Sequence, residues 1–168
     1  MKRQITRSNV NPDRLPLYFF AGRSVLTFQN PNTGSHMTVK ISQARDKQDR
    51  KKKLPIFFIN VSMLGDRETG YVFGGTLFQD TMTLKLSKHA PSGSQLGKIM
   101  LFLFHAVQNP QILREKRVGV LHEGRCFRCC LPLTHPESIN TGFGPDCLSM
   151  VLAGQANIKA EDLFEKVG

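Results

Sequence analysis

All four cysteines of this chain of 168 residues lie in one short stretch, GRCFRCCLPLTHPESINTGFGPDC, which runs from Gly124 to Cys147. Cys126 and Cys129 are spaced C-x2-C, so a tight turn between them can direct both thiolates at one metal ion. Clustered cysteines in an intracellular chain favour metal binding over disulfides. We therefore expect a zinc site here, with a reduced, metal-free cluster as the alternative.

Cys147 is the expected third ligand. It follows GFGP and opens an apolar run, LSMVLAG. Pro145 suits the first turn of a helix. Free backbone N–H groups in such a turn lower the pKa of a cysteine and favour the thiolate that a metal needs. A C-x2-C turn followed by a ligand at the start of a helix is typical of treble-clef zinc modules.

The fourth ligand is open, because structural zinc takes four. We rank His122 first, since it lies four residues before Cys126 at the end of an expected strand. Cys130 comes second, because it is adjacent to Cys129 and cannot easily point the same way. His135, in the following loop, comes third. A site built from His122 and the three cysteines would be closed and structural, which predicts a protein that is not an enzyme.

The cysteine segment resembles a small zinc-finger domain of uncharacterised function, found mostly in bacteriophage and bacterial proteins. Its pattern is close to G-x-C-x-x-C-G-x-x-L-T-x-P-E-S-x-x-x-G-x-G-P-x-C, and the resemblance covers about residues 122–150. A histidine ahead of the first cysteine is also similar, which supports His122. The family usually has glycine where this chain has Cys130, which places Cys130 outside the inherited ligand set. The matching positions are Gly124, Cys126, Cys129, Leu133, Thr134, Pro136, Glu137, Ser138, Gly142, Gly144, Pro145 and Cys147. The resemblance implies a zinc module and a phage setting, and therefore the cytoplasm of a bacterial host, but no activity.

The charge of the chain points to a polyanionic partner. Lys and Arg number 23 against 13 Asp and Glu, a net charge of +10. Such a balance favours nucleic acid before an anionic membrane. The segment ARDKQDRKKK, residues 44–53, holds six basic and two acidic side chains. Basic side chains there could meet phosphates and release counterions, and a merely solubilising loop is the alternative.

These features predict a non-catalytic binding protein. Neither a Gly-rich phosphate loop nor the H-x-E motif of zinc deaminases is present. We expect single-stranded DNA or RNA as the ligand, with a phage factor that modulates a host or phage protein of replication, transcription or defence as the alternative. Phe127 is expected to be exposed in the middle of the C-x2-C turn, where it could stack on bases. The predicted nucleic-acid contacts are Arg45, Lys47, Arg50, Lys51, Lys52, Lys53, Lys116, Arg117, Arg125, Phe127 and Arg128.

The first half of the chain reads as an antiparallel sheet. HMTVKIS, residues 36–42, alternates apolar and polar side chains as a half-buried strand does, and PNTG would join it to SVLTFQN in a hairpin. PIFFINVSML, residues 55–64, is expected to be a central strand. YVFGGTLF and TMTLKLSK form a further pair, in which Gly74-Gly75 marks a bulge or a close backbone approach. We expect four to six strands over residues 17–88.

One helix should follow, over about residues 93–108, capped by Ser92 or Ser94. It is apolar on nearly all sides, which indicates a helix buried against the sheet. The predicted fold is α+β: an antiparallel β-sheet with one buried helix and then a treble-clef-like zinc module. The expected domains are a basic flexible arm at 1–15, a β-rich domain at 16–120, and a zinc-binding module with C-terminal helices at 121–168. We expect a soluble, intracellular protein, because neither a secretory signal nor an apolar run of about 18 residues is present.

Overall fold

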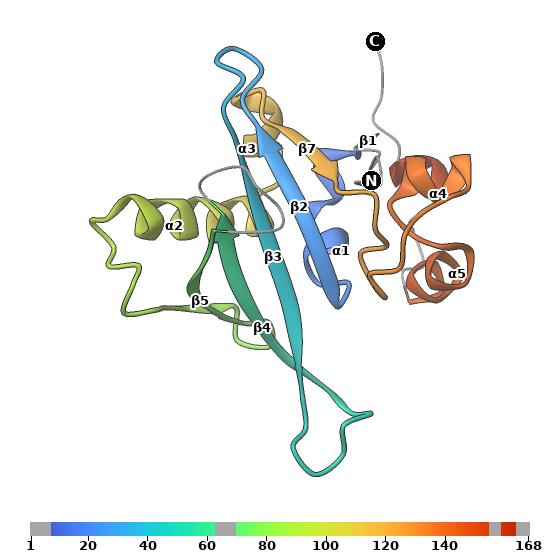
Figure 1. Cartoon of the computed structure of the whole chain (residues 1–168), viewed down its shortest axis with the longest axis horizontal. Coiled ribbons are helices and arrows are strands. Elements are labelled where there is room, and N and C mark those ends of the chain that lie inside the picture. Colours follow the sequence, from blue (N-terminus) through green and yellow to red (C-terminus); the bar gives the residue numbers. More distant parts are fainter. Residues whose placement is uncertain (1–7, 63–69, 155–158, 164–168) are drawn as a thin grey trace.

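The computed structural model describes residues 8–62, 70–154 and 159–163, in which a large antiparallel sheet runs through an α+β fold (Figure 1). Seven strands of the described residues lie in the order β1-β7-β2-β3-β4-β5-β6. Five of them fall between residues 17 and 88, as the alternating patterns predict. The strands are β1 (Ser8–Asn9), β2 (Arg23–Gln29), β3 (His36–Arg45), β4 (Lys53–Ser62), β5 (Tyr71–Phe78), β6 (Thr83–Leu86) and β7 (Gly119–His122).

Two hairpins build the middle of the sheet. Strands β2 and β3 pair with Leu26 opposite Val39, two buried side chains on the same face. The hairpin of β3 and β4 is longer, and its turn, residues 46–52, extends beyond the rest of the molecule (Figure 1). This turn holds most of the basic run, so the prediction of a basic loop outside the core is confirmed.

The side chains of strand β4 distinguish the buried face of the sheet from the exposed face. Phe57, Ile59 and Val61 are buried, whereas Phe58, between them, is 39% exposed. Successive side chains of a strand point to opposite faces, so Phe58 lies on the face away from the core.

Strand β5 bulges at the double glycine, as predicted. Ile59 pairs with Gly75 and Asn60 with Phe73, which leaves Gly74 as the extra residue. A Cβ at Gly74 would lie 2.4 Å from the Sδ atom of Met100, so the backbone also approaches the following helix closely there. The predicted bulge and the predicted close backbone approach are therefore both confirmed.

The expectation of a single helix before the cysteine segment is wrong. The expected helix is present as α2 (Gln95–Gln108), and the Ser94 hydroxyl accepts a hydrogen bond from the Gly97 N–H at 3.0 Å. Leu101 is 44% exposed, so α2 is buried on one face and not all round. The unexpected helical segments before the cysteine segment are too short to show a helical period in the sequence, and they are the 3-10 helix η1 (Pro12–Arg14) and the α-helices α1 (Leu15–Phe19) and α3 (Gln111–Glu115). The C-terminal part, where helices were expected, holds the α-helices α4 (Pro136–Thr141) and α5 (Pro145–Ala153) and the 3-10 helix η2 (Ala160–Leu163).

The described part of the expected N-terminal arm is packed on the fold. Ser8 pairs with His122, so β1 is an edge strand beside β7. Asn11 is buried, and its amide donates a hydrogen bond to the Asp162 carbonyl at 2.5 Å. Residues 1–7 of the predicted arm lie outside the described residues.

Strand β7 leads directly from the sheet into the cysteine segment. Because β7 lies between β1 and β2, the segment begins against the core (Figure 1). The buried cluster is continuous from the sheet through Tyr18 to Phe127 and Phe143. None of the described helices is both long enough and apolar enough to cross a bilayer.

Candidate metal centre and adjacent basic cleft

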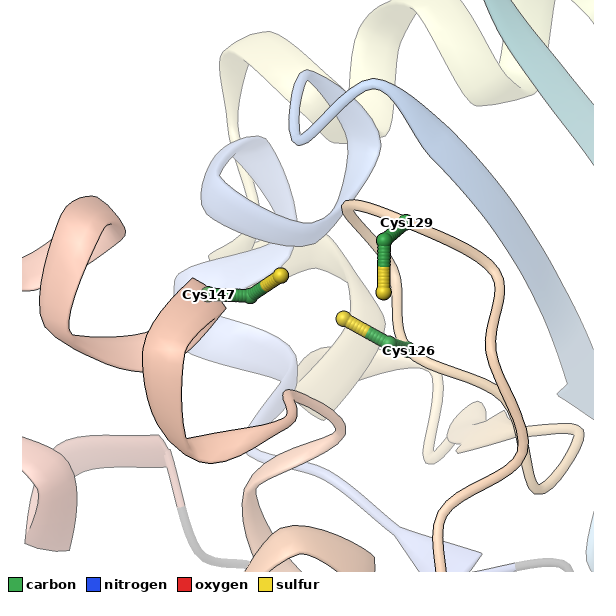
Figure 2. Close-up of side chains that lie close together, drawn as sticks. All are labelled: Cys126, Cys129 and Cys147. Carbon is green, nitrogen blue, oxygen red and sulfur yellow. The ribbon is translucent and has the colours of Figure 1, made fainter.

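The thiols of Cys126, Cys129 and Cys147 point toward one another (Figure 2). Their sulfur atoms all lie within 4.8 Å of one another. Cys126 and Cys129 come from the loop after β7, and Cys147 comes from the first turn of α5, as the spacing predicts. The structure therefore brings three of the four predicted ligands into one group that could hold a metal ion.

Backbone N–H groups favour the thiolate of Cys126. Burial by itself raises the pKa of this thiol, but hydrogen bonds from the backbone of Gly144, Cys129 and Arg128 together lower it below its ordinary value. The Arg128 N–H lies 3.4 Å from the Cys126 sulfur. Hydrogen bonds to the charged form stabilise that form, and a metal binds the thiolate.

Cys147 shows the opposite shift. Burial and the nearby Cys126 raise its pKa to about 11, although a hydrogen bond from Arg128 acts the other way. That bond joins the Arg128 guanidinium to the Cys147 sulfur at 3.6 Å. A bound cation would allow closely spaced thiols to ionise together, so binding would release protons. The donor set, three sulfurs near the start of a helix, fits a zinc ion.

The imidazole of His122, predicted as the fourth ligand, does not belong to this group. His122 is fully buried, and its Nδ1 accepts a hydrogen bond from the Gly124 N–H at 2.9 Å. Its Nε2 contacts the carbonyl of Ile139. Both ring nitrogens are thus engaged by the backbone, and burial, the largest influence, lowers the pKa of His122. This side chain ties the end of β7 to α4.

The other two candidates also stand apart from the thiol group within the part of the chain that the structure describes. Cys130 has a positive φ of 66°, and its carbonyl accepts a hydrogen bond from the Arg125 guanidinium at 3.1 Å. His135 is exposed at the start of α4. A metal bound by the three thiolates would therefore need a further donor.

The prediction that Phe127 is exposed is wrong. Its side chain is fully buried, with ring centroids 5.0 Å from Tyr18 and 5.5 Å from Phe143. Its N–H donates to the Gly142 carbonyl at 3.0 Å, and its carbonyl accepts from the Arg23 N–H at 2.9 Å. The C-x2-C turn packs against α1, so its middle residue faces the core and not solvent.

A basic cleft lies beside the thiol group, between the β3–β4 hairpin and the C-x2-C turn. It has a volume of about 950 Å³, and six of its lining side chains are cationic: Arg23, Arg45, Lys47, Arg50, Lys53 and Arg128. Arg128 therefore contacts both features, since its guanidinium also reaches Cys147.

Lys53 feels both its burial and the charges of its cationic neighbours. The pKa of Lys53 is lowered, first by burial and then by the neighbouring charges of Arg128 and Arg45. Asp46 is the acidic residue of the lining, and its carboxylate accepts hydrogen bonds from the backbone N–H groups of Gln48 and Asp49 at 2.8 and 3.1 Å. These hydrogen bonds stabilise the turn between β3 and β4.

The structure divides the predicted nucleic-acid residues into those that line the cleft and those that do not. Arg45, Lys47, Arg50, Lys53 and Arg128 line it. Lys51 and Lys52 are exposed on the same turn but lie outside the lining. Lys116 and Arg117 precede β7, whose Gly119 pairs with Gln29, so they lie at the far end of β2 from Arg23. Arg125 is exposed outside the lining.

Sequence reasoning missed two residues of the cleft. Arg23 opens β2 and is isolated from other charges in sequence, so nothing local indicates its role. Phe58 also lines the cleft, and it belongs to an apolar run whose exposed face only the strand register reveals.

A comparison with protein families gives a match in the C-terminal part of the chain. Residues 117–151 match the model of a family described as a family of unknown function (DUF6011). No curated protein and no solved structure matches the chain. The matched segment contains β7, the three clustered cysteines and most of α5. Residues 117–151 are therefore similar to a small cysteine-rich domain of unknown function, DUF6011.

Proposed function

We propose that this protein is a non-catalytic, zinc-containing nucleic-acid-binding protein, and that single-stranded DNA or RNA is its ligand. The basic cleft carries the proposal. Its six cations converge on one cavity, and its acidic residue, Asp46, is engaged by backbone N–H groups of the turn. Phosphate groups would relieve the repulsion among these cations and release their own counterions.

The electrostatics of Lys53 support an anionic ligand. Its ammonium is pushed toward the neutral form by burial and by the charges of Arg128 and Arg45. An anion in the cleft would reverse that tendency, because a nearby opposite charge favours the charged form. A row of phosphates supplies several such charges at regular spacing.

Zinc would act as a structural cross-link and not as a reaction centre. Held by Cys126, Cys129 and Cys147, it would join the C-x2-C turn to α5. Arg128 lies within that turn and reaches both Cys147 and the cleft. The metal would thereby fix one wall of the binding site. The resemblance of the cysteine segment to a phage zinc-finger domain supports a role in the cytoplasm of a phage-infected bacterium.

One observation favours the alternative, a protein partner. A second cleft of about 560 Å³ is lined by Leu17, Phe20 and Met150 among others, and Met150 is 59% exposed. Exposed apolar side chains around a cleft can form the centre of a protein interface. A phage factor that modulates a host or phage protein could use this surface.

Salt dependence distinguishes the two functions. The purified protein is titrated against fluorescent single-stranded DNA, duplex DNA and single-stranded RNA at 50 and 200 mM salt. With about four phosphate contacts on a single strand, the slope of log K against log salt is about −2.8, which is a roughly 50-fold loss of affinity over this range. Absence of binding to all three probes at 50 mM salt would refute the nucleic-acid function.

A further inference from the structure

An aromatic pair lies on the open face of the sheet. Phe58 on β4 and Phe73 on β5 have ring centroids 6.4 Å apart, and their side chains are 39% and 38% exposed. Phe57 and Ile59, the neighbours of Phe58, are buried on the opposite face. Exposure of two adjacent Phe rings is unfavourable in water, so this surface is suited to a ligand that covers it.

The aromatic pair is continuous with the basic cleft. Phe58 itself lines the cleft, so the aromatic pair adjoins the cationic side chains of the cleft. Further cations follow on the same face. The Lys40 ammonium lies 4.6 Å from the centroid of the Tyr71 ring, and Lys85 is exposed opposite Thr76, the strand partner of Phe58. This face thus carries aromatic side chains with cationic side chains beside them.

This combination of aromatic and cationic side chains matches the chemistry of a single strand. Phosphates pair with Lys and Arg, and unpaired bases offer flat faces that stack on aromatic rings. The bases of a duplex are already stacked on one another and cannot offer those faces. A protein partner would not need the adjoining row of cations, because charged residues are depleted at the core of protein interfaces.

We propose that Phe58 and Phe73 are a base-stacking platform, which binds two unpaired bases of a single strand whose phosphates occupy the basic cleft. This inference rests on the proposed function and deepens it. The cations supply affinity that depends on salt. The platform supplies affinity that does not, together with the preference for single strands over duplex.

The test uses the full chain and a fluorescent 12-nucleotide oligothymidylate. The variant Phe58→Ala/Phe73→Ala should bind about 30-fold more weakly, since stacking contributes at least about 1 kcal/mol per base. Its salt slope should equal that of the wild type, because no phosphate contact is removed. Val72→Ala is the matched control: Val72 is 40% exposed on the same strand but pairs with the buried Val61, and it should bind as the wild type does.

Two further arms guard against a folding defect. Phe58→Leu/Phe73→Leu keeps the apolar side chains but removes the rings, and it should also weaken binding at least tenfold. An oligonucleotide with abasic sites leaves the protein untouched, and the wild type should bind it as weakly as the Ala variant binds the intact strand.

The inference is overturned if both Phe variants bind within twofold of Val72→Ala, or if the wild type prefers duplex. In either case a steep salt slope would still show nucleic-acid binding, but a preference for duplex would also remove the single strand as the proposed ligand. It is also overturned if the wild type is a dimer that the Phe variants convert to a monomer without a change in oligonucleotide affinity, because the rings then serve self-association. Failure of the wild type to bind any oligonucleotide would remove the proposed function and this inference together.

Discussion

Replacing Gly142 by alanine should destabilise the cysteine segment strongly. Gly142 ends α4 with φ 81° and ψ 10°, a left-handed conformation that a side chain makes unfavourable by about 1–2 kcal/mol. A Cβ there would also lie 2.4 Å from Cε2 and 2.8 Å from Cδ2 of Phe127. The ring cannot yield easily, because Tyr18 and Phe143 hold it on other sides. Overpacking of this kind lowers the free energy of unfolding by about a further 1–3 kcal/mol.

The total expected loss is therefore about 2–5 kcal/mol in the free energy of unfolding. The chain offers a matched control in Gly34→Ala. Gly34 has φ 74°, but a Cβ there would meet no atom within 4 Å. That variant should lose only the conformational part, about 1–2 kcal/mol. The difference between the two variants, about 1–3 kcal/mol, measures the clash with Phe127 alone.

Urea unfolding followed by circular dichroism measures both losses, and unchanged m-values would show that both variants unfold as the wild type does. If Gly142→Ala is no less stable than Gly34→Ala, the Phe127 ring does not pack beneath the end of α4. The C-x2-C turn would then lack the support that brings Cys126 toward Cys147, and the reasoning about the site would be refuted.

Three further outcomes are expected. Protein purified without added metal should contain about one equivalent of zinc, as measured by mass spectrometry of the metal content. Cys147→Ser should lose the zinc, whereas Cys130→Ser should keep it. Loss of zinc in Cys130→Ser would make Cys130 a ligand. Because burial lowers the pKa of His122, protonation favours the unfolded chain, and the free energy of unfolding should fall as the pH drops below about 6.5. His122→Gln should remove this part of the pH dependence. Identical pH slopes of the wild type and the variant between pH 5 and 7.5 would contradict the buried, neutral imidazole. Arg128→Gln should retain zinc but weaken oligonucleotide binding several-fold, and equal affinities would exclude Arg128 from the cleft's function.

Local patterns in the sequence predict the elements well where one face of a strand is buried. The alternation of Met37, Val39 and Ile41 with polar residues indicates β3, and the double glycine indicates the bulge in β5. The spacing of the cysteines likewise predicts the three-thiol group. In each case the residues that carry the signal lie within one short stretch of the chain.

Contacts between distant segments could not be predicted in this way. The burial of Phe127 depends on α1, which is more than a hundred residues earlier in the chain. The engagement of His122 by the backbone depends on how α4 packs, and its position before Cys126 gives no indication of that. Adjacent Phe57 and Phe58 have the same chemistry, and only the pairing of Phe58 with Thr76 shows which one is exposed.

The measurement that tests the central claim most directly compares two charge reversals in the same turn. Lys47→Glu/Arg50→Glu alters side chains that line the cleft, and Lys51→Glu/Lys52→Glu makes the same change of charge outside it. The salt slope of single-strand binding should flatten by about 1.4 for the first pair, at about 0.7 per contact, and by much less for the second. Equal effects of the two pairs would show that the salt slope depends on the charge of the turn and not on the position of each side chain. That result would contradict a binding site in the cleft.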